Sequence, residues 1–245
     1  MIYYGAILDP LDRRDRVFRA KGESQLPYSV DSRDEQTPVR FQKESDCVGQ
    51  AITAWAEWKY WKILRYMPEL SPTAAYKRGQ EKDIWPGSSY DGTSLRGALK
   101  AWKEWGLCPL ADWPYMGVAE PTAGKASKKY PLAEYRRIHG AYDIMQAIHE
   151  HGAVLGAFQA HEGWEHPVNG VIVEDGEPTE GHAVLICGFH TIRGFRLKNS
   201  WGDRWGDGGY AYLPKEMAMR DGQDFWLPIV KNGDWFTQLV KRIRG

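Results

Sequence analysis

The spacing of apolar residues changes partway along this 245-residue chain, and that change is the strongest constraint on its fold. From position 47 the apolar positions recur at three- and four-residue spacing, at Ala51, Trp55, Trp58 and Leu64. This periodicity predicts a long amphipathic helix that begins near Asp46, whose carboxylate is expected to accept from backbone N–H groups as an N-cap. A second helix is expected over 94–105, ended by Gly106.

The second half of the chain has a β-type pattern. Short apolar runs separated by Gly-rich turns cover 153–158, 183–189, 195–197, 209–213 and 225–230, and a helix is expected around 142–150. The Pro- and Gly-containing stretch 112–129 is the expected crossing between lobes. The sequence therefore predicts an α+β fold with three parts, which are an N-terminal arm over 1–25, a mainly helical lobe over 26–125 and a β-rich lobe over 126–245.

Composition excludes several classes of function. The 32 Lys and Arg residues balance 32 Asp and Glu residues, so no basic excess is available for nucleic acid. A hydrophobic content of 42% and a mean hydropathy of −0.56 are typical of a folded globular chain, and no apolar run is long enough to span a bilayer. Charged residues interrupt the first 18 positions, so we expect no secretory signal peptide. We therefore expect no nucleic-acid or membrane partner, and the oligomeric state stays open.

Three widely spaced cysteines do not suggest a disulfide framework, so a reducing, cytoplasmic location is expected, with association with a virion as a further possibility. Cys47 stands at the start of the first expected helix, where the helix dipole favours a thiolate. A lone cysteine in an apolar segment is more often a small buried hydrophobic residue, so a catalytic assignment needs partners. His182 opens a buried apolar run, where an imidazole is costly unless it has a role, and Asn199 follows 17 residues later.

Papain-like thiol hydrolases need an oxyanion donor, a nucleophile, a general base and acid, and an orienting residue. In chain order, Gln42, Cys47, His182 and Asn199 match these four roles. The run Asn199-Ser200-Trp201-Gly202 through Tyr210 resembles the papain family's Asn-Ser-Trp-Gly block, and Gly181-His182-Ala183-Val184 resembles its histidine block. Leu26-Pro27-Tyr28 through Arg33 resembles the start of the mature enzymes, and Asp112-Trp113-Pro114-Tyr115 a landmark in mid-chain. The resemblance covers roughly residues 26 to 230 and is closest to the disulfide-free bacterial or phage branch.

The resemblance implies a papain-like two-lobed fold, with the cleft between a helical lobe and an antiparallel β-barrel-like lobe. It implies a cysteine endopeptidase that hydrolyses peptide or protein substrates through a thioester, without a cofactor. Cys47 would attack the carbonyl, His182 would protonate the leaving amine, and Asn199 would orient the His182 ring. The implied oxyanion donors are Gln42 and the Cys47 N–H. Trp201 would shield the Asn199–His182 hydrogen bond, and the strip at Gly92 and Thr93 would bind the peptide backbone.

Two departures from the family pattern concern the oxyanion hole and the nucleophile. Gln42 precedes Cys47 by five residues where the family has six. Asp46 lies directly before the nucleophile, and its negative charge would oppose formation of the Cys47 thiolate. These departures keep two alternatives open. The chain could be a non-catalytic papain-fold structural or binding protein, for instance of a phage particle, or an acyl transferase or deamidase that uses the same three residues.

The pair His161 and His166 superficially resembles a zinc protease motif. The two residues lie five apart, however, and would not share one helix face, so no metal site is expected. The N-terminal arm is too short to resemble the family's inhibitory pro-region, but it could lie across the cleft.

Overall fold

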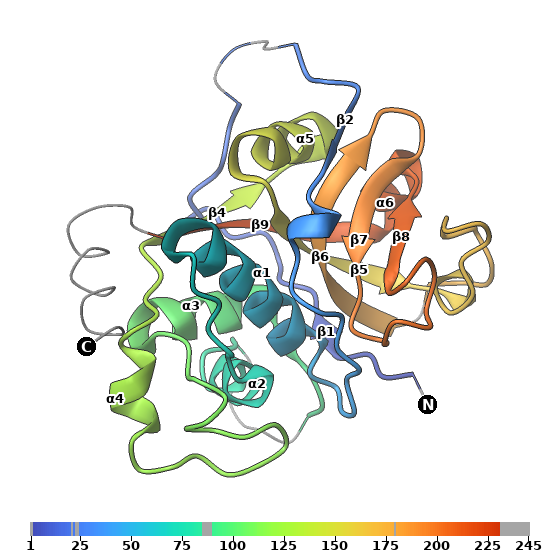
Figure 1. Ribbon diagram of the computed structural model, residues 1–245. Helices are drawn as coiled ribbons and strands as arrows, with labels where there is room; N and C mark the ends of the chain where they lie inside the picture. Colours follow the sequence, from blue (N-terminus) through green and yellow to red (C-terminus); the bar gives the residue numbers. More distant parts are fainter. Residues whose placement is uncertain (1, 21, 23–24, 85–89, 179, 231–245) are drawn as a thin grey trace.

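The computed structural model describes residues 2–20, 22, 25–84, 90–178 and 180–230 (Figure 1). Helices dominate the first half of the chain and an antiparallel sheet dominates the second, which confirms the predicted α+β architecture. The helices of the first half are α1 (Cys47–Leu64), α2 (Pro72–Gln80), α3 (Leu95–Trp105) and α4 (Ala123–Ser127). Single-turn 3₁₀ helices cover Arg33–Glu35 and Glu162–Trp164.

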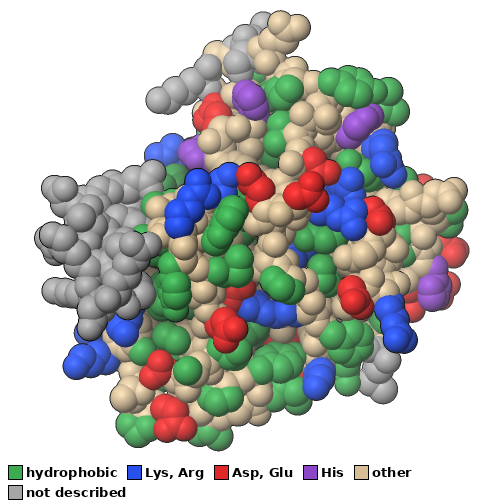
Figure 2. All heavy atoms as spheres, in the orientation of Figure 1, with side chains coloured by type: hydrophobic (Ala, Val, Ile, Leu, Met, Phe, Trp, Pro, Cys, Tyr) green, Lys and Arg blue, Asp and Glu red, His purple; other side chains and the backbone are tan. Residues whose placement is uncertain are grey.

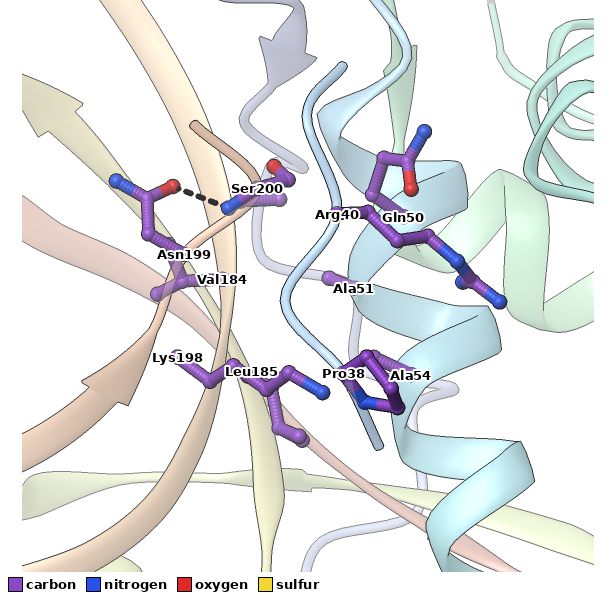
Figure 3. A pocket seen from close by; sticks show the side chains of 11 residues that line it. Pro38, Arg40, Gln50, Ala51, Ala54, Val184, Leu185, Lys198, Asn199 and Ser200 are labelled. Atoms are coloured by element: carbon purple, nitrogen blue, oxygen red, sulfur yellow. Dashed lines mark hydrogen bonds between the residues drawn. The ribbon is translucent and has the colours of Figure 1, made fainter. Parts of the chain in front are cut away.

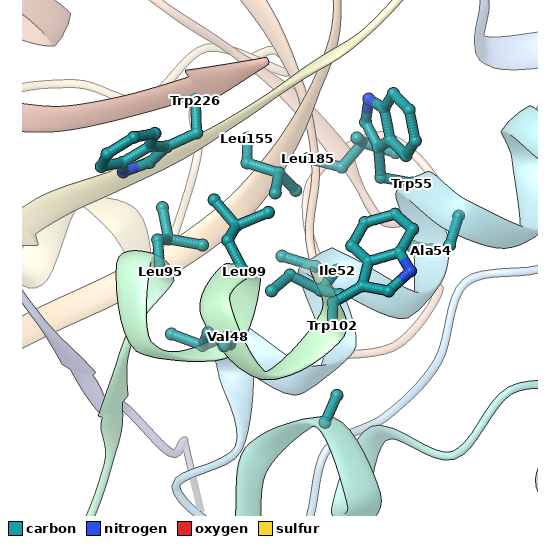
Figure 4. Packing of buried hydrophobic residues seen from close by; sticks show 14 of the residues in the cluster. Val48, Ile52, Ala54, Trp55, Leu95, Leu99, Trp102, Leu155, Leu185 and Trp226 are labelled. Carbon is teal, nitrogen blue, oxygen red and sulfur yellow. The ribbon is translucent and has the colours of Figure 1, made fainter. Parts of the chain in front are cut away.

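Helix α1 is the centre of the molecule. It packs against α2 and α3 on one side and against strands β5 (Val154–Ala160) and β6 (Glu180–His190) on the other. Figure 4 shows Trp55 of α1 among side chains from both lobes, and its Nε1 donates to the Ala153 carbonyl at 2.9 Å. The expectation of an amphipathic α1 is therefore wrong, because both lobes cover the helix and bury it on most of its circumference.

Four strands complete the sheet of the second half, namely β4 (Glu134–Ile138), β7 (Gly194–Lys198), β8 (Tyr210–Leu213) and β9 (Gly222–Ile229). Neighbouring strands follow the order β4-β9-β5-β6-β7-β8, and β2 (Ser29–Asp31) pairs with β6. Helices α5 (Gly140–His151) and α6 (Lys215–Asp221) pack on this sheet. Each apolar run expected to be a strand overlaps one. Strand β4 was not expected, because its sequence Glu-Tyr-Arg-Arg-Ile is mostly polar.

The register of this sheet positions the functional side chains. His182 lies opposite Phe158 of β5, and Leu185 lies opposite Lys198 at the end of β7. Asn199 follows Lys198 directly, so the pairing of β6 with β7 carries Asn199 to the same edge of the sheet as His182.

The N-terminal arm joins the two lobes. Its strand β1 (Ala6–Ile7) pairs in parallel with β3 (Thr93–Ser94) of the helical half, and the Gly5 N–H donates to the Gly181 carbonyl of the sheet at 2.9 Å. The division of the chain at residues 25 and 125 stays a prediction.

A buried ionic cluster anchors the same arm. Arg96 of α3 pairs with Asp9 at 3.3 Å and Asp15 at 2.7 Å, and Arg137 of β4 pairs with Asp224 of β9 at 3.3 Å. Arg137 also lies 3.4 Å from Asp15, so this carboxylate of the arm lies between one arginine of each lobe.

Within the described residues, no helix is long and apolar enough to cross a membrane. Hydrophobic, acidic and basic side chains are interspersed on the face shown in Figure 2, in keeping with the balanced charge of the chain.

Candidate active site

The predicted nucleophile and its predicted partners come together between the lobes. Cys47 is the first residue of α1 and is completely buried. The backbone N–H of Ala183, the residue after His182, is directed at its sulfur. His182 Nε2 and Asn199 Oδ1 lie 2.7 Å apart, and His182 Nδ1 has no hydrogen-bond partner among the described residues. One ring nitrogen is thus held by Asn199, and the other is free for a proton exchanged with the sulfur.

Burial disfavours the charged forms of both reacting groups. Burial raises the pKa of the Cys47 thiol to about 12, aided by the charge of Asp46 and opposed by backbone N–H groups of Ala183 and Val48. Burial also lowers the pKa of His182 to about 4, and the hydrogen bond to Asn199 Oδ1 offsets only part of this shift. Desolvation therefore opposes the thiolate that the helix N-terminus was expected to favour.

Trp201 lies flat on the His182 ring, with the ring centroids 4.4 Å apart and the planes 29° from parallel. The edge of Trp164 approaches the same ring, with centroids 6.0 Å apart. These two indoles keep water from the His182–Asn199 hydrogen bond, which strengthens it in a low local dielectric. The position of Trp201 agrees with the shielding role that the sequence suggested.

Gln42 is held rigidly despite its shortened spacing from Cys47. Ser200 Oγ donates to Gln42 Oε1 at 2.6 Å, and the Gln42 N–H donates to the Ser200 carbonyl at 2.8 Å. The side-chain amide therefore presents its Nε2 donor to two carbonyl oxygens, those of Glu44 at 3.0 Å and Tyr3 at 3.1 Å. Five residues suffice to aim this donor at a peptide carbonyl in the cleft.

Asp46 precedes α1 but does not cap it, which corrects the expectation from its position. Its side chain makes no capping hydrogen bond to the first turn. Oδ2 instead accepts from Gln50 Nε2 at 2.8 Å. Burial raises the pKa of Asp46 to about 7, although the Gln50 hydrogen bond opposes the shift. The Asp46 carboxyl is thus protonated for much of the range below neutrality.

Residues 3 to 5 of the N-terminal arm fill the cleft. The Tyr3 carbonyl accepts from both Gln42 Nε2 and Trp201 Nε1, each at 3.1 Å. The Tyr4 ring meets His182 and Trp201 edge-on, with centroids 5.8 and 5.4 Å away. The cleft therefore already holds a length of peptide backbone, and the open alternative that the arm crosses the cleft is the observed arrangement.

The predicted substrate strip also contacts the arm. The Thr93 N–H donates to the Gly5 carbonyl at 2.9 Å. The Gly92 N–H donates to the Tyr76 hydroxyl, and the Gly92 carbonyl accepts from Gln80 Nε2, so neither group binds the arm. Gly92 instead leaves room for the arm, because a Cβ there would lie 2.3 Å from the Gly5 oxygen. Thr93 thus binds backbone directly, whereas Gly92 allows the close approach.

A cavity of about 20 Å³, enough for one water molecule, lies behind the site between α1 and strands β6 and β7 (Figure 3). Lys198 crosses this interface, and its Nζ donates to both oxygens of Thr37 at 2.6 Å. Burial lowers the pKa of Lys198 to about 8. This contact ties the segment that leads to Gln42 to the end of β7.

Sequence reasoning gave no role to Ser200, Tyr3 or Asp83. Ser200 stands inside the recognised Asn-Ser-Trp-Gly block, so the motif contained its signal. Asp83 accepts from Thr93 Oγ1 at 2.8 Å and from Ser94 Oγ at 2.7 Å, and nothing in its local sequence indicates that it orders the substrate strip.

The histidines that superficially resembled a zinc motif do not assemble a metal site. His161 Nδ1 accepts from the Gly163 N–H at 3.2 Å, and the described residues contain no group of three or more His, Cys, Asp or Glu side chains that could hold a metal ion.

A helix-terminal cysteine beside a histidine that an asparagine orients is the arrangement of the papain-like thiol hydrolases. The profile of the papain family cysteine proteases matches residues 26–223, which is most of the chain. The chain belongs to the papain family.

Similar proteins support this assignment. A peptidase C1-like protein of Acanthamoeba polyphaga mimivirus is 26% identical, with the match covering 90% of this chain and 78% of the viral one. A cysteine protease of Blomia tropicalis is 26% identical over 53% of this chain, and the match spans only 40% of the mite protein. Among solved structures, xylellain, a cysteine protease from Xylella fastidiosa, superposes with a TM-score of 0.78 at 25% identity, covering 94% of this chain and 96% of xylellain.

Proposed function

We propose that this chain is a cysteine endopeptidase in which Cys47, His182 and Asn199 carry the chemistry. The Cys47 sulfur attacks the substrate carbonyl as its proton passes to His182 Nδ1. His182 returns that proton to the leaving amine, so that the C–N bond breaks and a thioester remains on Cys47. Water then attacks the thioester, releasing the carboxylic acid and restoring the thiol. Gln42 Nε2 and the Cys47 N–H stabilise the oxyanion that forms in each half of the reaction.

The observation that carries this proposal is the Tyr3 carbonyl. It lies 3.1 Å from Gln42 Nε2, in the same cleft as the His182–Asn199 pair, so the cleft accepts a peptide carbonyl at the proposed oxyanion donor. The resting arrangement is latent, because the arm occupies the cleft and Cys47 is fully buried.

The similarity to xylellain and the three free cysteines support placing the chain in the disulfide-free bacterial or phage branch of the family. The free thiols also support a reducing compartment, such as the cytoplasm.

The test is cleavage of an unstructured protein substrate by the Gly5→Leu variant and by Gly5→Leu combined with Cys47→Ala. A Cβ at Gly5 would lie 2.2 Å from the Ser45 carbonyl oxygen, so leucine there displaces the arm. We expect cleavage by the first protein and none by the second. Cleavage that survives Cys47→Ala would overturn the proposal, and so would an inactive Gly5→Leu protein.

Product masses measured with and without an added amine distinguish the remaining alternatives. Hydrolysis gives free carboxylic acids, whereas an acyl transferase gives amides of the added amine. Conversion of glutamine to glutamate without chain cleavage would indicate a deamidase.

A further inference from the structure

The side of the cleft that Tyr4 occupies has an unusual charge distribution. No lysine or arginine occurs between Arg137 and Arg193, whereas the part of this stretch from 161 to 181 carries Glu162, Glu165, Glu174, Asp175, Glu177 and Glu180. Arg220 pairs with Glu174 at 2.6 Å. Within the described part of the chain, no Lys or Arg forms an ion pair with Glu162, Glu165 or Glu180.

The arm shows that these glutamates reach the cleft. The Tyr4 hydroxyl donates to Glu165 Oε1 at 3.2 Å while the Tyr4 ring rests against His182 and Trp201. Burial and the negative charges of Glu165, Glu180 and Glu162 together raise the pKa of Tyr4. The end of the Tyr4 side chain therefore lies in a region of negative potential that the nearby protein does not neutralise.

Glu165 is well placed to select a substrate side chain. It ends the 3₁₀ turn at Glu162–Trp164, where its N–H donates to the Glu162 carbonyl at 2.8 Å. Trp205 Nε1 anchors the same turn by donating to the Trp164 carbonyl at 2.7 Å. A carboxylate on an anchored turn loses little entropy when it binds a cation.

The position of Tyr4 identifies the part of a substrate that would lie here. His182 must protonate the leaving amine, so the residue just after the scissile bond lies against His182 and Trp201, where the Tyr4 ring now rests. Lysine and arginine have a reach similar to that of tyrosine, and their apolar stems suit an indole surface.

We propose that Glu165, supported by Glu180 and Glu162, makes this peptidase select polypeptides with arginine or lysine immediately after the scissile bond. This inference rests on the proposed peptidase function. A charge-assisted hydrogen bond to a half-buried carboxylate corresponds to a preference of about tenfold over a neutral residue, falling as salt screens the charges.

The experiment compares kcat/KM for three peptides that differ only in having arginine, glutamine or glutamate after the cleaved bond, in the Gly5→Leu background. We expect about tenfold preference for arginine, a ratio near one after Glu165→Gln, and a preference for a glutamate peptide after Glu165→Lys. Glu177→Gln, an exposed acid in the same stretch, is the matched control and should keep the preference. Equal kcat/KM values for the arginine and glutamine peptides in the Gly5→Leu protein would overturn the inference. A preference for arginine that survives Glu165→Gln would also overturn it.

Binding separates this inference from the peptidase proposal. The same peptides are titrated by fluorescence anisotropy into Gly5→Leu protein that also carries Cys47→Ala, with and without Glu165→Gln. Tighter binding of the arginine peptide that Glu165→Gln removes supports the subsite even if no peptide is cleaved. Equal affinities would overturn it even if the enzyme is active.

Discussion

His182 and Asn199 have separable roles, because only His182 moves a proton. His182→Ala in the Gly5→Leu background should lower kcat by about 10⁴-fold, since it removes the general acid and base. Asn199→Ala should cost clearly less, because it removes only the 2.7 Å contact that orients the ring. The measurement is kcat on one peptide, with His166→Ala, an exposed histidine, as the control. Equal losses in the two variants would mean that Asn199 does more than orient the ring.

Asp46 should make the fold less stable as pH rises. Its pKa is raised from 3.8 to about 7, so the folded state favours the protonated carboxyl. The stability from this group is therefore complete below the ordinary Asp pKa and is lost as pH rises through about 7. The raised pKa, about 7 against 3.8, corresponds to at most about 4 kcal/mol.

The isosteric variant Asp46→Asn keeps an acceptor for Gln50 and carries no titrating proton. Urea unfolding at pH 5 and pH 8 should show Asp46→Asn gaining stability over the parent between the two pH values. The exposed control Asp34→Asn should show no such gain. If the difference in unfolding free energy between the parent and Asp46→Asn is the same at pH 5 and pH 8, the account is contradicted.

At the scale of elements, tertiary contacts decide the features that local sequence does not. Trp55 and Trp58 share a helical spacing that predicts one apolar face, yet both lobes cover α1 and bury it on most sides. The sequence 134–138 has two arginines and no apolar run, yet Arg137 is buried because Asp224 and Asp15 neutralise it. Local periodicity gives no information on the second lobe that covers α1 or on the carboxylates that pair with Arg137.

The arm's ionic cluster predicts that the arm is bound more weakly as pH rises. Asp9 and Asp224 adjoin each other, since the Asp9 N–H donates to Asp224 Oδ2 at 3.3 Å. Arg96, Arg137 and Asp15 complete the cluster, so three carboxyls face two guanidiniums. Burial raises the pKa of Asp9, and that of Asp224 well above its ordinary value. Arm attachment is thus strongest below the ordinary Asp pKa and is lost as pH rises through the raised values.

Hydrogen exchange at the β1 amides, corrected for intrinsic rates, tests this prediction. Protection should fall between pH 5 and pH 9 in the parent protein. Asp9→Asn, which keeps the shape of the protonated carboxyl, should show a smaller fall. Protection that rises with pH would contradict the proposed origin of the effect.

At the scale of the whole molecule, the sequence predicted most of what the chemistry requires. A thiol hydrolase needs its nucleophile, base and orienting residue in fixed local settings, so Cys47, His182 and Asn199 could be read from motifs. The structure pairs His182 with Asn199 and directs the N–H of Ala183, the residue after His182, at the Cys47 sulfur. The path of the arm could not be predicted, because residues 3 to 5 lack a pattern and contact residues such as Gly181 that are far away in the sequence.

The central claim is that Cys47 is a catalytic nucleophile covered by the chain's own arm. The most direct test is the rate of iodoacetamide alkylation at each of the three cysteines against pH, read by peptide mass spectrometry, in the parent and in Gly5→Leu. The exposed arm variant Leu11→Ala is the control. We predict slow alkylation of Cys47 in the parent and the control. In Gly5→Leu, alkylation of Cys47 should be fast and selective down to about pH 5.5, where an ordinary thiol with a pKa of about 8.5 is nearly inert. Slow alkylation of Cys47 in Gly5→Leu, or fast alkylation in the parent, would contradict the account.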